Sequence, residues 1–444
     1  MLDYKYIKDN LAAVKQNVLD RNMDPARADA DKVVELYDKR TALVTELQGL
    51  QQKRNENAKA MKQKLDNDER AKLIEAGKAL KEEIAKVEKE QKKTEEALEE
   101  AARQIPNMYH PQAPVGKLDT ENLEVKVVGT PRKFDFEPKD HVALGESLDI
   151  LDFDRGTKVS GPKFYYLKNE AVFLEQALIM YALNTLRKHN FNMFITPDVA
   201  KEDILKGIGF NPRGNESNVY SIEEEGTCLV ATAEITLGGY HQDEILPKEK
   251  LPLMYGGLSH CFRREAGAAG QFSKGLYRVH QFDKVEMFVY STPEQSDELH
   301  EKLRQIEEEI FTGLGIPFHV VDTCTGDLGA PAYRKWDLEA WMPGRADEAH
   351  PDGDYGEVTS TSNCTDFQAR RLNVKYRDDD GKNKYVHMLN GTAIAVGRAM
   401  LALIENYQNE DGSVTIPEVL VPFCGFDKIG PKAKVESPVI ISKK

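Results

Sequence analysis

The chain has few cysteines and no long apolar run, and both features restrict where it can work. Its 444 residues contain no stretch of about 18 apolar residues, the length that a bilayer-spanning helix needs, so we expect no membrane partner. Met1 is followed by no apolar stretch of the kind that a secretory signal carries. The five cysteines are scattered and form no Cys-x-x-Cys pair. This argues against a disulfide framework or a structural zinc site and favours a reducing, cytoplasmic location.

Positive charge is in the minority, with 60 lysines and arginines against 74 aspartates and glutamates. The formal net charge of −14 argues against indiscriminate nucleic-acid binding, although it leaves room for a local basic patch. The sequence also lacks a Gly-x-Gly-x-x-Gly or Walker-type loop, so the common parallel-sheet nucleotide-binding folds lose support.

Proline is missing between residues 26 and 105, and glycine is rare there. Apolar residues recur with alternating gaps of three and four along two stripes, Val33–Met61 and Leu73–Ala101. The stripes predict two coiled-coil helices joined by a turn at 65–68. We therefore expect an antiparallel hairpin over about residues 27–104, with helices of roughly 35 residues and about 50 Å each.

The predicted tip of this hairpin is basic. Between residues 53 and 64 there are five basic side chains and one acidic side chain. Lys53, Arg54, Lys59 and Lys62 belong to this set. On an acidic protein such a cluster favours an anionic partner. A solvated spacer or a dimerisation device is the alternative that the pattern alone leaves open.

The sequence predicts four regions. They are an N-terminal helical arm (1–110), a proline-rich linker (111–131), an α+β core (132–427) and a C-terminal extension without an assigned role (428–444). In the core we predict helices over 173–188 and 291–312, and strands over 229–237, 253–264, 276–290 and 386–389. Because strands dominate the centre and follow one another closely, we expect an antiparallel β-sheet flanked by helices.

Polar residues concentrate on one face of the predicted strand Leu276–Tyr290. That face holds Arg278, His280, Phe282, Lys284, Glu286 and Phe288. The opposite face is more apolar, and the preceding strand places Arg263 and Glu265 on one common face. So many different polar types on one side predict a binding floor rather than solvated surface.

Several segments together carry a family resemblance. They are TAE (232–234), FRREAG (262–267), HQFDKVE (280–286), EVTS (357–360) and GTAIAVGR (391–398). The second and third resemble the second signature motif of class II aminoacyl-tRNA synthetases in its seryl form, and the last resembles the third motif. TAE is similar to the family's serine-binding loop, and EVTS is close to a further family signature. The N-terminal hairpin resembles the family's tRNA-binding arm.

The resemblance implies an AMP-forming serine–tRNA ligase. Such an enzyme activates L-serine with ATP to seryl-adenylate and transfers the seryl group to the 3′ end of serine tRNA. Charging of selenocysteine tRNA stays open. The resemblance also implies Mg²⁺ as a cofactor and a homodimer as the working form.

Residue roles follow from the resemblance, position by position. ATP contacts are implied for Arg263, Arg264, Glu265, Val279, His280, Gln281, Phe282, Glu357, Val358, Thr359, Ser360 and Arg398. Serine contacts are implied for Thr232, Ala233, Glu234, Arg263, Glu286, Asn390 and Thr392. Metal contacts are implied for Glu357 and Ser360, and tRNA contacts for Lys53, Arg54, Lys59 and Lys62. Arg263 and Arg398 are the implied catalytic pair, since fixed cations stabilise the charge that develops on phosphate oxygens.

The sequence departs from the family at Gln271, where arginine is common, and this leaves contact with the tRNA end open. One rival interpretation is a related ligase that charges a carrier protein, which would be expected to lack the basic-tipped arm. Another is a non-catalytic coiled-coil interaction protein with a degenerate core, which would have lost the motif residues.

Overall fold

The computed structural model describes residues 1–64, 66–210, 218–266 and 272–431. The chain forms two compact units, Met1–Met108 and Tyr109–Lys444.

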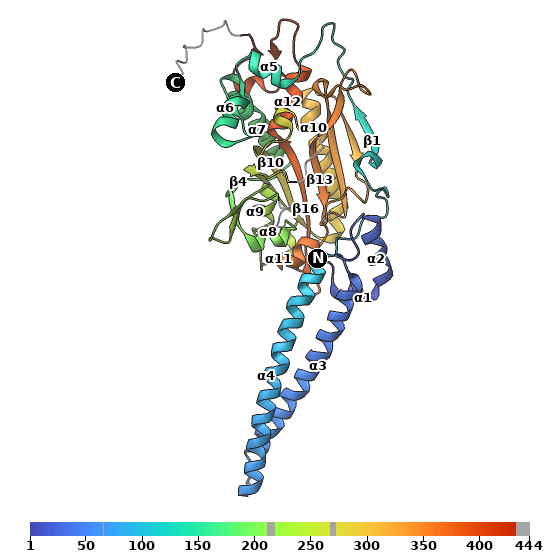
Figure 1. Cartoon of the computed structure of the whole chain (residues 1–444), viewed down its shortest axis with the longest axis vertical. Coiled ribbons are helices and arrows are strands. Elements are labelled where there is room, and N and C mark those ends of the chain that lie inside the picture. The colour runs from blue at the N-terminus through green and yellow to red at the C-terminus, as the bar shows by residue number, and fades with distance from the viewer. Residues whose placement is uncertain (65, 211–217, 267–271, 432–444) are drawn as a thin grey trace, which may run out of the picture. The chain divides into compact units, whose positions relative to one another are not determined.

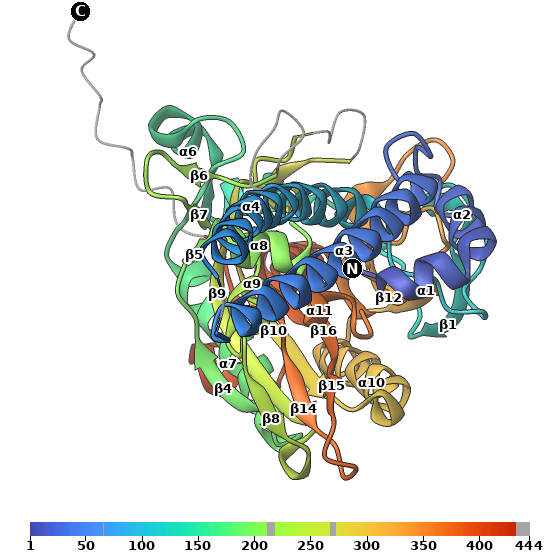
Figure 2. The same cartoon turned by 90° about the horizontal axis from the view of Figure 1, so that it is seen from below.

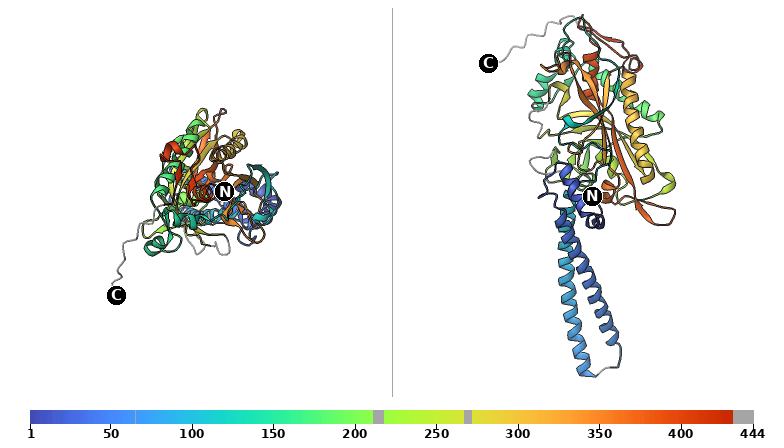
Figure 3. Two further views of the ribbon diagram at one scale, coloured as in Figure 1. Left: turned by 90° about the horizontal axis from the view of Figure 1, so that it is seen from above. Right: turned by 90° about the vertical axis from the view of Figure 1, so that its right-hand side faces the viewer.

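The first unit consists of two short helices and a long helical hairpin (Figure 1). The helices are α1 Tyr4–Asp9, α2 Leu11–Asp20, α3 Ala30–Ala60 and α4 Asn67–Gln104. At 31 and 38 residues, α3 and α4 are about 46 and 57 Å long. The antiparallel pair lies side by side along its length (Figure 3), which confirms the predicted coiled coil.

The hairpin is held by a thin apolar seam and by polar contacts at its edges. Leu50, Ile84 and Val87 are buried between the helices. Lys39 pairs with Glu90 at 2.5 Å, outside the seam. The N-cap Asp66 begins α4 with a capping box, and the helix ends where Pro106 prevents its continuation. The last buried residue of the second stripe is Ala102, and the predicted Ala101 is only half-buried.

The second unit is built on an eight-stranded sheet with the order β1-β11-β12-β13-β16-β10-β9-β4. These strands are β1 Leu123–Val128, β4 Asn192–Ile195, β9 Leu253–Phe262, β10 Gln281–Ser291, β11 Phe318–Asp322, β12 Arg334–Met342, β13 Asp354–Asn363 and β16 His387–Ala395. All neighbours are antiparallel except β4 and β9. The predicted α+β class is confirmed.

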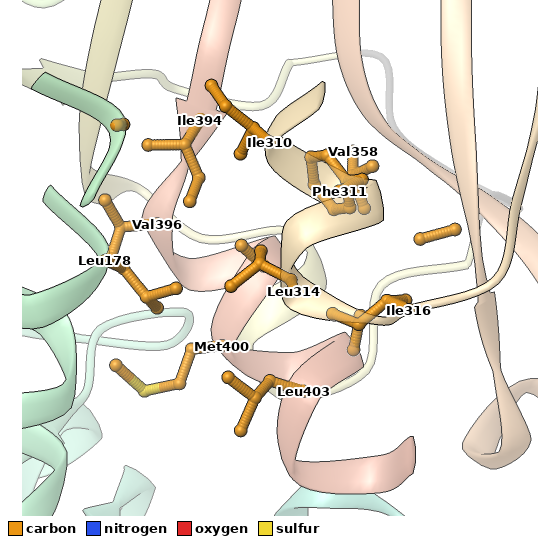
Figure 4. Close-up of a cluster of buried hydrophobic side chains, with 14 of the residues drawn as sticks. Leu178, Ile310, Phe311, Leu314, Ile316, Val358, Ile394, Val396, Met400 and Leu403 are labelled. Carbon is orange, nitrogen blue, oxygen red and sulfur yellow. The ribbon is translucent and has the colours of Figure 1, made fainter. Parts of the chain in front are cut away.

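Helices cover both faces of this sheet. On one face, α7 Glu170–Lys188, α10 Ser296–Leu314 and α12 Val396–Asn406 enclose the main core, part of which is drawn in Figure 4. The other face packs against α8 Glu202–Ile208, α9 Ala233–Gly239 and α11 Phe367–Leu372. Along β10, Val285, Met287 and Val289 enter the first core while Phe288 and Tyr290 enter the second. The predicted alternation therefore holds over this part of the strand.

Shorter elements complete the unit. The helices are α5 His141–Ser147, α6 Phe153–Ser160, α11 as above and α13 Val421–Cys424. The strands are β2 Leu151–Asp152, β3 Tyr166–Leu167, β5 Val199–Lys201, β6 Ser221–Ile222, β7 Thr227–Leu229, β8 Ile245–Pro247, β14 Lys375–Arg377, β15 Asn383–Tyr385, β17 Val414–Thr415 and β18 Lys428–Ile429. Figure 2 shows β8, β14 and β15 as a small sheet of their own.

Some predicted boundaries differ from the structure. The predicted strand 229–237 is wrong, because β7 ends at Leu229 and Thr232 caps the N-terminus of α9. The predicted strand 276–290 begins only at Gln281, after the 3₁₀ turn η3 Gly275–Tyr277. The predicted linker 111–131 contains β1, which pairs with β11 at the sheet edge. Ile429, in the predicted C-terminal extension, is buried in the main core.

No helix in the described ranges combines the length and apolar character needed to cross a bilayer. All five cysteines lie in the described residues, are buried, and form no disulfide.

Candidate active site

A pocket opens on the sheet between the ends of β9, β10, β13 and β16, with the N-terminus of α12 beside it. Its empty volume, including the part that is open to solvent, is about 510 Å³. Its walls are Arg263, Glu265, Leu276, Tyr277, Arg278, Val279, Phe282, Lys284, Glu357, Val358, Thr359, Thr392, Ala395, Gly397 and Arg398. Nine of these belong to the residues singled out in the sequence, so the motifs converge on one cavity although they are far apart along the chain.

Arg263 lies at the floor of the pocket, just after β9. Its guanidinium carbon is 5.1 Å from the ring centroid of Phe282, within range of a cation–π contact. Its Nε donates to the carbonyl of Ala231 at 3.4 Å, and its backbone N–H donates to His280 at 2.9 Å. These contacts fix a cation above an aromatic ring, a combination suited to a nucleotide with its phosphates.

Arg398 forms the opposite wall at the start of α12. It donates to the carbonyls of Glu357 (2.8 Å) and Tyr277 (3.2 Å), and its guanidinium carbon lies 4.5 Å from the centroid of the Tyr277 ring. Burial lowers the pKa of Arg398, but Glu357, Tyr277 and other acidic groups outweigh that effect and raise it. Arg398 is therefore a permanent cation, and its hydrogen bonds connect the start of α12 with β13 and with the 3₁₀ turn η3.

Arg278 and Lys284 also line the pocket, and both were on the predicted charged face without an assigned role. Arg278 forms an ion pair with Glu265 at 2.6 Å. Glu265 has a φ of 50°, which is uncommon for a residue other than glycine and directs the chain out of β9. Arg278 thus adds a third arginine to the pocket, beside Arg263 and Arg398.

A buried polar cluster lies deeper, on β10 and β16. Oε2 of Glu286 contacts Lys284 Nζ and accepts hydrogen bonds from Thr232 (3.3 Å) and Thr392 (3.5 Å). Lys284 also donates to Thr392 Oγ1 at 3.4 Å. The α9 N-cap, Thr232, reaches this cluster because the chain turns into a helix there.

A second carboxyl lies next to this cluster. Oε1 of Glu234 accepts from Gln368 (2.8 Å) and Asn390 (3.0 Å). Burial, together with the nearby charge of Glu286, raises the pKa of Glu234 to about 7. Of the two neighbouring carboxyls, Glu286 is the one in contact with a cation. The predicted serine-binding residues Thr232, Ala233, Glu234, Glu286, Asn390 and Thr392 are all buried or half-buried here.

Four predicted ATP residues do not line the pocket: Arg264, His280, Gln281 and Ser360. The His280 ring packs against Phe164 and its Nδ1 lies 2.8 Å from the carbonyl of Arg263. Gln281 lines a separate cavity with Asp283 on the other side of β10. Strict alternation fails here because β10 begins only at Gln281. Arg264 contributes its backbone N–H to Asn218, at 2.9 Å.

The predicted metal ligands lie on β13, where a bulge interrupts the register between Glu357 and Thr359. Such a bulge allows residues three apart to share a face. Burial raises the pKa of Glu357, but Arg398, Lys335, Arg263 and Arg278 together hold it below its usual value. The Glu357 side chain is 45% exposed toward the pocket.

Ser360 lies directly opposite Asp337 in the sheet and forms a hydrogen bond with it. Glu357 and Ser360 both offer oxygen, the ligand that Mg²⁺ prefers. The described residues contain no set of three or more histidine, cysteine or acidic side chains arranged for a metal. Glu357 and Ser360 fit a magnesium ion only if phosphate oxygens and water complete its coordination shell, as they usually do in nucleotide-binding sites.

Sequence reasoning missed Glu307 on α10, which is completely buried behind the sheet. It accepts from Thr359 Oγ1 at 3.0 Å. Burial and the charges of Asp337 and Glu286 raise its pKa well above the usual range, although the Thr359 hydrogen bond opposes this. No sequence signal could identify it, because a glutamate on an amphipathic helix normally faces water.

The basic residues of the hairpin lie near the end of α3 or just beyond it. Lys53, Arg54, Lys59 and Lys62 are all exposed. Gln271 lies outside the described residues.

The antiparallel sheet and its arginine-rich pocket define a class II aminoacyl-tRNA synthetase core. A family model for the tRNA synthetase class II core domain (G, H, P, S and T) matches residues 219–407. A model for the seryl-tRNA synthetase N-terminal domain matches residues 1–109. The serine–tRNA ligase of Treponema denticola is 73% identical over 430 residues, which cover 97% of this chain and 100% of that protein. The chain belongs to the seryl-tRNA synthetase family.

Solved structures agree with this assignment. The seryl-tRNA synthetase of Pyrococcus horikoshii, complexed with ATP, has a TM-score of 0.89 and 39% identity, covering 98% of this chain and 100% of that one. The cytoplasmic serine–tRNA ligase of Naegleria fowleri, in complex with AMP, has a TM-score of 0.84 and 32% identity, covering 98% of this chain and 99% of that one.

Proposed function

We propose that this chain is a serine–tRNA ligase, which activates L-serine with ATP and transfers the seryl group to the 3′ end of serine tRNA. The observation that carries the proposal is a pocket lined by three arginines that adjoins, through Lys284 and Thr392, a buried cluster of one carboxylate and two threonine hydroxyls. Relatives named serine–tRNA ligase match nearly the whole chain. The synthetase structure from Pyrococcus horikoshii with ATP bound supports ATP as the nucleotide.

In the first step, a serine carboxylate oxygen attacks the α-phosphorus of ATP, a P–O bond forms, and pyrophosphate leaves with the electron pair of the broken bond. Arg263 lies beside Phe282, where an adenine ring stacked on Phe282 would bring the α-phosphate close. Arg398 faces the other end of the nucleotide. Both are held by backbone carbonyls, so little reorganisation is needed when charge develops on the phosphate oxygens.

Serine selection follows from the buried polar cluster. In this proposal Glu286 and Thr232 bind the substrate ammonium group, and Glu286 and Thr392 meet its hydroxyl. Alanine would leave these buried groups without a partner, which typically costs a factor of about 10⁴ or more in specificity. Threonine differs by one methyl group and is rejected by shape, a weaker filter of roughly 10²-fold.

Glu357 and Ser360 would hold Mg²⁺ against the phosphates, where it would neutralise charge on the leaving pyrophosphate. The chain's own contribution is the placement of two oxygen ligands on one bulged strand. The neighbouring Asp337 accepts from Ser360 and so fixes the direction of its hydroxyl.

The helical hairpin is proposed to bind serine tRNA through its basic tip. Its exposed cations Lys53, Arg54, Lys59 and Lys62 match the phosphate backbone in charge. Neutralising all four should weaken tRNA binding and flatten its salt dependence, while serine-dependent exchange stays intact. An unchanged slope of log K against log salt would contradict the role of the tip.

A homodimer and a cytoplasmic location are also proposed. The edge strand β4 and the adjoining helix α7 expose apolar side chains, among them Ile195 at 85% and Phe173 at 59%. Such an edge and patch are suited to a second copy of the chain. Five buried cysteines without a disulfide suit a reducing compartment.

The main test is exchange of radioactive pyrophosphate into ATP with each amino acid in turn. We expect serine to support exchange, alanine to be rejected strongly and threonine to be rejected more weakly. Exchange without serine dependence, or faster exchange with another amino acid, would refute the assignment. Acylation of serine and selenocysteine tRNA then separates this function from that of a ligase acting on a carrier protein.

A further inference from the structure

Lys284 is a buried cation on β10 between two residues with proposed substrate contacts. Its side chain is only 7% exposed, and that of Glu286 is 2% exposed. Alternate residues of a strand share one face, so Phe282, Lys284 and Glu286 follow one another on the same side of β10, and the first two line the pocket. Lys284 therefore lies beneath the part of the pocket between the proposed adenine and serine positions.

The ammonium group of Lys284 is already bound to the two side chains that would bind serine. It contacts Glu286 Oε2 and donates to Thr392 Oγ1 at 3.4 Å. Thr232 and Thr392 also donate to that same oxygen. The contacts described for this carboxylate thus converge on Oε2, so Oε1 is the oxygen that remains for a substrate ammonium group.

Other charged and titratable groups face this pair from every neighbouring element. Glu234 approaches from α9, Cys261 from β9, Arg263 from the segment after β9, and Glu307 from α10 behind the sheet. Burial raises the pKa values of Glu234, Cys261 and Glu307, so these three groups are largely uncharged or only partly ionised at neutral pH. Lys284 is consequently the cation in direct contact with Glu286.

We propose that Lys284 is a positioning residue that supplies the counter-charge of the Glu286 carboxylate and holds this carboxylate and the Thr392 hydroxyl ready for serine. The proposal rests on the proposed function, in which Glu286 binds the substrate ammonium. A buried carboxylate that loses its counter-charge takes up a proton, because the charged form cannot be solvated. A protonated Glu286 would have to release that proton before it could bind a cation.

The decisive experiment counts protons during serine binding. Calorimetric titration of the full-length protein with serine at pH 7, in buffers of different ionisation enthalpy, gives the number of protons released. We expect Lys284→Met to release about one proton more than the unaltered protein, in which only the neighbouring Glu234 contributes a fraction of a proton. Equal proton release by Lys284→Met and the unaltered protein would overturn the proposal.

Steady-state exchange supplies a second readout. For Lys284→Met we expect the KM for serine at pH 7 to rise roughly tenfold or more, while the KM for ATP changes less than about twofold. The serine KM should recover as pH rises from 6 to 8.5, and Lys284→Arg should restore most of the loss. Equal changes in both KM values, or a pH-independent loss, would contradict the proposal.

The surface variant Lys168→Met serves as the matched control, because Lys168 is 35% exposed and pairs with Asp149 outside the pocket. It should leave both KM values unchanged. If Lys284→Met does not fold, Lys284→Gln supplies the same comparison of proton release, and Lys284→Arg should release no more protons than the unaltered protein. Failure of the proposed function has a different signature, since the unaltered protein would then show no serine-dependent exchange.

Discussion

Replacing Glu405 with glutamine should destabilise the larger unit and loosen the ATP pocket. Glu405, on α12, is 1% exposed. Its Oε1 accepts from the backbone N–H of His141 at 3.0 Å and lies 2.7 Å from the Nδ1 atom, and its Oε2 accepts from Gly344 at 2.7 Å. Because His141 Nε2 accepts from the N–H of Leu276 at 3.1 Å, the ring proton is on Nδ1 and points at the carboxylate.

The magnitude follows from this geometry. Glutamine offers one oxygen where the carboxylate offers two, so its NH₂ group must face a donor, either Gly344 or His141. One hydrogen bond to a charged acceptor is lost, and a buried donor is left unsatisfied. Together these cost about 3 kcal/mol. For a unit of this size, that lowers the melting temperature by roughly 5 °C.

Unfolding of this unit can be followed by tryptophan fluorescence, because both tryptophans, Trp336 and Trp341, lie on β12. The exposed Glu410→Gln is the control and should change the melting temperature by less than about 1 °C. The KM for ATP should also rise in Glu405→Gln, since Leu276 precedes Tyr277 in the pocket wall. A shift no larger than that of the control would refute the reasoning.

Three further substitutions test local burial and packing. Burial, then the charge of Asp283, raises the pKa of Glu175 to about 7, against an opposing effect of His260. Because this pKa is higher in the folded state, the associated stabilisation is complete below the unfolded-state pKa near 4.5 and is lost as pH rises toward 7. The loss amounts to at most about 1.4 kcal/mol per pH unit. Glu175→Gln should therefore flatten the decline in unfolding free energy over that pH range. In α6, a Cβ on Gly156 would lie 2.3 Å from the Phe164 carbonyl oxygen, so Gly156→Ala should destabilise by roughly 2 kcal/mol in thermal unfolding despite the helix preference of alanine. Gly49→Ala, with open space around it, should instead stabilise the hairpin slightly, and a loss there would contradict the steric argument.

The sequence predicted those parts of the structure that depend on local periodicity. The two stripes predicted the helical hairpin, because the pair packs through an apolar seam that repeats along both helices and includes Leu50, Ile84 and Val87. Alternation along β10 predicted which side chains face the pocket from Phe282 onward. It failed for His280, because the periodicity of a strand says nothing of residues before the strand begins.

Contacts between distant segments were beyond such reasoning. The burial of Glu307 depends on the packing of α10 against β13 and β16, and no feature of its own helix signals it. The turn from β7 into α9 depends on Thr232 acting as a cap, which an apolar run concealed. The contact between Lys284 on β10 and Thr392 on β16 joins two residues that are 108 positions apart in the sequence.

The strand order has a consequence for how the enzyme is made. β16 lies between β13 and β10, yet it is the last strand of the large sheet to leave the ribosome. Until residues 387–395 are available, β4, β9 and β10 form one partial sheet and β1, β11, β12 and β13 another, each with an unpaired edge. Thr392 and Arg398 arrive with this final insertion, so a nascent chain gains its pocket only as the two halves close. If synthesis stops before that point, the incomplete chain carries two partial sheets with unpaired edges. Such a chain is expected to bind chaperones and to have no partial activity.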